Sequence, residues 1–103
     1  MARKDRTVQV ALARAALIVA SMRRTLLTYE ELGRAIGIEG VGLSHHMRFV
    51  LDELSEQCHD QREPSLAALV VAKQTGKPGP GWEDGDRPWY AEVRRVYAHW
   101  RPV

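Results

Sequence analysis

Apolar residues repeat with helical spacing along the first part of the chain. In residues 7–23 they recur every three or four positions: Val8, Ala11, Leu12, Ala15, Ile18, Val19 and Met22. This spacing predicts a helix with an apolar stripe along one side. A second stripe covers much of the opposite side, through Val10, Ala13, Leu17 and Ala20. A helix that is apolar nearly all round lies centrally in a core or is shared with a partner.

The second stripe is open to two interpretations. In the first, it is additional to the stripe that the helix needs for its own core, and it pairs with the same stripe of a second copy. A homodimer through the N-terminal helix would result, because two-fold pairs are the commonest oligomers. In the second, a C-terminal helix folds back and covers the stripe within one chain.

Residues 28–58 have the pattern of a helix-turn-helix. Thr28-Tyr-Glu-Glu31 is a capping box, in which the hydroxyl of Thr28 and the carboxylate of Glu31 each accept from the other residue's backbone N–H. The helix that it opens ends after Ile36, since Gly37 can adopt the left-handed conformation of a helix end. A third helix over about 42–58 follows, with one apolar stripe: Leu43, Met47, Val50, Leu51, Leu54 and Cys58.

Residues 65–82 predict a wing, and residues 87–100 predict a C-terminal helix. A strand from Leu66 to Ala72 leads through a turn at Gln74-Thr-Gly76 into an irregular return arm, where prolines cannot donate to a ladder. The last helix has Asp86 as its cap and an apolar side that consists of Trp89, Val93, Val96, Tyr97 and Trp100. The expected fold is mostly α with a small β-hairpin: a winged helix-turn-helix with an additional N-terminal helix and a C-terminal helix.

Length and composition fit one folded domain spanning residues 1–103. A chain of 103 residues has room for one core and no cleft between lobes. Its apolar stretches, such as Ala15 to Ala20, are far too short to span a bilayer, and no segment has the pattern of a signal peptide. We therefore expect a cytoplasmic protein without membrane contact. The single cysteine, Cys58, can form no internal disulfide and no closed cysteine-based metal site.

Charge is distributed unevenly along the chain. Residues 1–24 have a net charge of +5, residues 28–63 of −5, and residues 64–103 of +2. The basic side chains thus gather at the two ends, and residues 1–6 form a basic arm that we expect to be flexible. This arm and a basic wing favour contact with a nucleic acid, whereas the acidic middle favours a protein partner.

The segment Thr28 to Gly81 resembles the DNA-binding domain of the alkyltransferase and alkyltransferase-like family. The match is carried by Thr28-Tyr-Glu-Glu-Leu-Gly-Arg-Ala-Ile-Gly37, and further on by Pro64, by Leu69-Val70-Val71 and by Gly76. Leu66 to Val71, Thr75-Gly-Lys-Pro-Gly79 and Tyr97-Ala-His-Trp100 are also similar to small uncharacterised winged-helix proteins of bacteria and their phages. The resemblance implies a winged-helix fold, with the Tyr29 hydroxyl donating to a phosphate.

This chain lacks the chemistry of the alkyltransferases. Their reactive cysteine lies in a Pro-Cys-His-Arg motif, whereas Pro64 is followed here by Ser65-Leu66, and Cys58 lies upstream in Gln-Cys-His-Asp. The arginine that the family inserts into the duplex has no counterpart, because Leu43, Ser44 and His45 occupy that stretch. Neither alkyl transfer nor base flipping is expected.

The candidate DNA-binding residues are Tyr29, Ser44, His45, His46, Arg48, Lys73 and Lys77. Side chains at the start of the third helix can hydrogen-bond to base edges or phosphates, and lysines of a wing can follow a phosphate backbone. The alternative for each group is a solvated polar surface. Because the third helix becomes acidic from Asp52 onward, only its first turns suit a groove of DNA.

No pattern in the chain indicates catalysis, a metal or a cofactor. Cys58 is about three helical turns from His45 and His46, and the adjacent residues Cys58, His59 and Asp60 cannot orient one another as a nucleophilic triad requires. We expect a non-enzymatic protein that binds double-stranded DNA, as a small transcriptional regulator or an architectural factor. The alternative is a protein-interaction module that uses the acidic helix-turn-helix face and the aromatic C-terminal helix.

Overall fold

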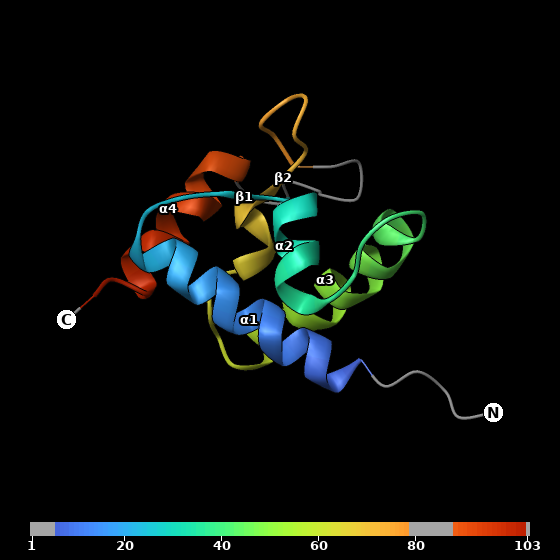
Figure 1. Cartoon of the computed structure of the whole chain (residues 1–103). Helices are drawn as coiled ribbons and strands as arrows, with labels where there is room; N and C mark the ends of the chain where they lie inside the picture. The colour runs from blue at the N-terminus through green and yellow to red at the C-terminus, as the bar shows by residue number, and fades with distance from the viewer. Residues whose placement is uncertain (1–5, 79–87, 103) are drawn as a thin grey trace.

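The computed structural model describes residues 6–78 and 88–102, which are mostly helical (Figure 1). The elements are α1 (Thr7–Met22), β1 (Leu27–Thr28), α2 (Tyr29–Ile36), α3 (Leu43–Asp60), the 3₁₀ helix η1 (Leu66–Leu69), β2 (Val70–Val71) and α4 (Trp89–His99). The two short strands pair in parallel, with Leu27 opposite Val70 and Thr28 opposite Val71. In Figure 1, α1 runs along one side of the molecule, and its C-terminal end lies beside α4. No helix in these two ranges is both long and apolar enough to cross a membrane.

α1 buries the stripe that we expected to be additional, so the homodimer interpretation of that stripe is wrong. Val10, Ala13, Leu17 and Ala20 are at most 4% exposed, whereas Val8, Leu12, Val19 and Met22 are 43–64% exposed. α2, α3, η1 and α4 all contact α1. Two apolar stripes on one helix look alike in sequence. Here the buried one also carries Ser21, whose hydroxyl donates to the carbonyl oxygen of Val96 in α4 at 3.1 Å.

The capping box of α2 is confirmed. The backbone N–H of Glu31 donates to the Thr28 hydroxyl at 3.1 Å, and the backbone N–H of Thr28 donates to the Glu31 carboxylate at 2.8 Å. The helix ends at Gly37, whose φ of 84° is left-handed. Gly33 allows α2 to approach the chain that follows, because a Cβ added there would lie 2.5 Å from both the Ile38 carbonyl oxygen and a methyl of Leu43. This contact fixes how α3 leaves the turn.

The strand expected over Leu66–Ala72 is wrong for its first four residues. Leu66–Leu69 form η1, and all four residues are at most 9% exposed. In a strand, successive side chains would instead point to opposite faces of the sheet. Only Val70–Val71 are extended. The turn expected after Ala72 is present, since the Ala72 N–H donates to the Lys77 carbonyl oxygen at 2.8 Å. Most of the expected return arm, residues 79–82 of 77–82, lies outside the described ranges.

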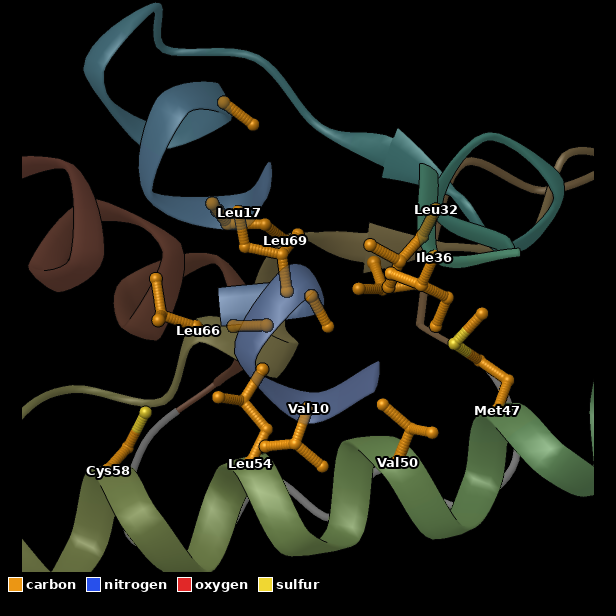
Figure 2. Close-up of a cluster of buried hydrophobic side chains, with 14 of the residues drawn as sticks. Val10, Leu17, Leu32, Ile36, Met47, Val50, Leu54, Cys58, Leu66 and Leu69 are labelled. Atoms are coloured by element: carbon orange, nitrogen blue, oxygen red, sulfur yellow. The ribbon is translucent and has the colours of Figure 1, made fainter. Parts of the chain in front are cut away.

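The core gathers apolar side chains from α1, α2, α3, η1 and α4 (Figure 2). Figure 2 shows Leu17, Leu66 and Leu69 facing Val50 and Leu54 of α3. The apolar side of α4 is confirmed: Val93 and Val96 are buried, and Trp89, Tyr97 and Trp100 pack against the cluster. The Trp89 indole N–H donates to the Ala68 carbonyl oxygen at 2.6 Å and ties α4 to η1. The N-cap is Pro88 rather than the expected Asp86, which lies outside the described residues.

Candidate nucleic-acid interface

A groove of about 680 Å³ lies between the start of α2, one side of α3 and the chain around β2. Its lining contains four of the seven candidate residues, namely Tyr29, Ser44, His45 and Arg48. The rest of the lining consists of Leu51, Asp52, Ser55, Ala67, Val70 and Pro78. Candidate side chains from two helices therefore share one hollow with the residue that follows the turn at 72–77.

The helical period of α3 explains which of its side chains enter the groove. Ser44, Arg48, Leu51 and Ser55 are separated by four, three and four residues, so they share one side of the helix beside its buried stripe. Leu51 and Ser55 were not among the candidates from the sequence, although their helical spacing from Ser44 and Arg48 places them on the same side of α3. Leu51 is half-buried and provides apolar surface next to the polar side chains.

An aromatic stack fixes the outer edge of the groove. The His45 ring packs edge-on against Phe49, with centroids 5.0 Å apart, and against His46 at 5.6 Å. The Arg6 guanidinium carbon lies 4.7 Å from the centroid of Phe49 on the other side of this stack. The chain that carries the basic arm therefore enters the fold next to the first turns of α3. Residues 1–5 of that arm lie outside the described ranges, and sequence analysis did not single out Phe49.

His46 stands apart from the other candidates on α3. It is half-buried, does not line the groove, and lies against the turn that precedes the helix, where a Cβ on Gly42 would be 3.0 Å from the His46 ring. Its place beside Gly42 and His45 indicates that His46 shapes the N-terminal end of α3, whereas His45 and Arg48 are the exposed side chains.

Lys73 and Lys77 project from the turn at 72–77 and are exposed, but neither lines the groove. The turn is held by the Ala72 N–H, and the Lys77 N–H donates to the Thr75 hydroxyl at 3.2 Å. Because Pro78 lines the groove directly after Lys77, the basic turn borders the groove without entering it. Tyr29 is half-buried at the opposite margin and also packs against the core.

The charge of the groove changes along α3. Arg48 is the cation in the lining and Asp52, one turn further on, is the carboxylate; both are exposed. Glu53 and Glu56 continue the acidic surface beyond Asp52. The end of the groove near His45 and Arg48 therefore suits an anion, while the end near Asp52 repels one.

A second hollow lies beside the C-terminal half of α3 and includes Cys58, His59 and Glu63 in its lining. Cys58 is 1% exposed, and burial raises the pKa of its thiol, which disfavours the reactive thiolate. His59 and Asp60 are exposed, whereas Cys58 is buried. Among the described residues, no three His, Cys, Asp or Glu side chains are placed to hold a metal ion. No protein-family model, curated protein or solved structure matches this chain.

Proposed function

We propose that this chain is a non-enzymatic, winged-helix protein that binds double-stranded DNA. The first turns of α3 enter a groove of the duplex, with His45, Arg48 and Ser44 toward base edges or phosphates. The turn that carries Lys73 and Lys77 acts as the wing and contacts the backbone. A small transcriptional regulator or an architectural factor would act in this way without chemistry of its own.

One observation carries the proposal: polar and basic groups from distant parts of the chain converge at the N-terminal half of α3. Arg48 lines the groove, Arg6 lies on the stack beside His45, and the turn that ends at Lys77 borders the groove at Pro78. The positive end of the helix dipole adds to this field. Such a cluster attracts phosphates in spite of the acidic residues further along α3, because counterion release depends on the cations within reach of the backbone.

A DNA titration with matched variants tests the proposal. Fluorescence anisotropy on a mixed-sequence duplex at about 50 mM salt is low enough in ionic strength to detect even non-specific contact. The pair His45→Ala with Arg48→Gln removes the proposed contacts, and the control pair His59→Ala with Arg62→Gln makes the same changes at exposed positions at and just beyond the other end of α3. We expect about tenfold weaker binding for the first pair only, as for the loss of a good base or phosphate contact. Absence of wild-type binding would refute the proposal.

A protein-interaction module is the second candidate function, and the exposed acidic row on α3 favours it. Asp52, Glu53 and Glu56 are all exposed and could meet a basic partner. The aromatic side of α4 supports this alternative less well, since Trp89 and Trp100 pack against the core and Tyr90 is the exposed aromatic, at 56%. This alternative would be favoured if the wild-type protein does not bind DNA but is retained on a column of a basic protein, and if replacing these carboxylates abolishes the retention.

A homodimer through α1 remains part of the proposal, now through the other face of the helix. The exposed residues Val8, Leu12, Ala15, Val19 and Met22 are separated by four, three, four and three residues, the spacing of a helix–helix seam. In an antiparallel two-fold pair Arg6 would lie near Arg23 of the second copy, so repulsion should weaken the dimer at low salt. Sedimentation should show a dimer that strengthens with salt and is lost in Leu12→Glu but not in the control Gln57→Glu. A wild type that stays monomeric at every concentration and salt would contradict this.

A further inference from the structure

A second basic surface lies where the end of α1 meets α4, away from the groove. It consists of Arg23, Arg24, Arg94 and Arg101 together with Tyr90 and Tyr97, and we call it the α4 patch. All four arginines are exposed. In Figure 1, α4 and the N-terminal half of α3 lie at opposite ends of the molecule, with the strand pair between them. None of the patch residues lines the groove, so the patch and the groove are separate surfaces.

Helical spacing and one buried hydrogen bond bring the patch together. Tyr90, Arg94 and Tyr97 lie four and three residues apart and share a side of α4. The bond from the Ser21 hydroxyl to the Val96 carbonyl oxygen holds the last turn of α1 against this helix, so that Arg24 follows directly beside it. Burial raises the pKa of the Tyr97 phenol, and the positive charge of Arg24 opposes that shift.

The arginines of the patch are available for a ligand. Within residues 6–78 and 88–102, the ion pairs are Arg14 with Glu63 and Arg95 with Glu92, and neither includes a patch residue. Glu92 also accepts from the Ser65 N–H at 2.7 Å, on a different side of α4 from the patch. The Arg94 guanidinium carbon lies 5.4 Å from the centroid of Tyr90, a contact that leaves the N–H groups of Arg94 open to an acceptor.

We propose that the α4 patch binds the phosphate backbone of duplex DNA, so that one chain holds DNA at two places. Among the described residues none of these four exposed arginines forms an ion pair, and a polyanion that contacts them releases counterions. The forked guanidinium groups match phosphate oxygens, and the phenol of Tyr90 can donate to them. These contacts carry no base information, so the patch adds affinity without sequence preference. The inference rests on the proposed function in that it takes DNA as the ligand.

The contacted phosphates belong either to the same duplex or to a second one. Reaching both surfaces with one straight duplex needs about 12 base pairs, since the molecule is 42 Å long and each base pair rises about 3.4 Å. If the protein binds a second duplex, fluorescence energy transfer should appear between two differently labelled short duplexes that are mixed together with the protein. If both surfaces bind the same duplex, the affinity should instead rise once the duplex is longer than about 12 base pairs. Either result supports the patch.

The decisive comparison uses two variants with the same net charge. Arg24→Gln with Arg94→Gln alters the patch, and Arg34→Gln with Arg62→Gln removes two exposed arginines elsewhere. Binding is measured by anisotropy on a 30-base-pair duplex between about 50 and 200 mM salt. Loss of two phosphate contacts should lower the slope of log K against log salt by about 2, so the affinity lost over this range becomes roughly tenfold smaller. The control should keep the wild-type slope, and melting curves monitored by circular dichroism should be unchanged for both.

The outcomes separate the patch from the groove. If the patch variant has the slope and affinity of the control, the inference is wrong, and the proposed function stands as long as the His45 and Arg48 pair still matters. If the patch variant weakens binding and that pair does not, the patch is supported and the groove assignment fails. If the wild type binds vesicles that contain phosphatidylserine through these arginines and does not bind DNA, both are overturned.

Discussion

Replacing Gly33 by alanine tests the contact that positions α3. The new Cβ would lie 2.5 Å from the Ile38 carbonyl oxygen and 2.5 Å from the Leu43 side chain, well inside contact distance. Leucine can change rotamer, but the carbonyl belongs to the backbone of the turn, so α2 and the turn have to separate. Forcing a methyl group into such a packed contact costs about 1–3 kcal/mol.

Two effects oppose each other at this position. Alanine is favoured over glycine inside a helix by about 1 kcal/mol. Since the clash involves backbone, we expect it to prevail and to leave a net destabilisation of up to about 2 kcal/mol. With a denaturation slope of about 1–3 kcal/mol/M in urea, the midpoint should fall by roughly 1 M.

Urea titration followed by circular dichroism measures this shift, and Gly37→Ala serves as the comparison. Gly37 has a φ of 84° with no atom within 4 Å of an added Cβ, so alanine there introduces backbone strain without a clash. Gly33→Ala should also weaken DNA binding under conditions where it is folded, because α3 is displaced, whereas Gly37→Ala should affect stability alone. A Gly33→Ala midpoint at or above that of the wild type would refute the close approach of α2 to the turn.

Three further predictions concern stability. Thr28→Ala removes the capping box of α2 and should cost about 1 kcal/mol in chemical denaturation, whereas an unchanged midpoint would mean that the cap contributes nothing. Glu63→Gln leaves the mostly buried Arg14 guanidinium without its carboxylate, 2.7 Å away, and should cost about 2 kcal/mol, against almost none for the exposed control Glu53→Gln. Because burial raises the pKa of Cys58, the unfolded thiol ionises first, so stability is complete below about pH 8.5 and falls at higher pH. Melting temperatures against pH should show a smaller alkaline decline for Cys58→Ala, and parallel curves would contradict this.

Local signals in the sequence predicted the helices well. The capping box at Thr28, the glycine after Ile36 and the single apolar stripe of α3 each act within a few residues, so their outcome depends little on the rest of the chain. The gathering of Tyr29, Ser44, His45 and Arg48 around one groove is likewise consistent with the order of helices and the period of α3. The caps and helices could be predicted because neighbouring residues determine them.

The misassigned features depend on residues far apart in the chain. The stripe of α1 that faces the core is chosen by α2, α3, η1 and α4, which all follow it in the chain, so its own spacing could not decide between Leu12 and Leu17. Residues 66–69 are apolar without alternation, a pattern that fits a buried helical turn as well as a strand. Arg6 and Phe49 meet across the fold, and no spacing rule connects them.

The hydrogen bond between Ser21 and Val96 has a consequence for how the protein is made. It joins residues 75 positions apart, and Val96 and Val93 belong to the same core cluster as Leu17 of α1. A growing chain that ends before α4 therefore leaves the first helix with part of its apolar face exposed and the Ser21 hydroxyl without its buried acceptor. Folding should be completed only once α4 has been synthesised and can pack on α1, so a translational stop anywhere before Val96 should yield aggregation-prone fragments rather than a smaller stable unit.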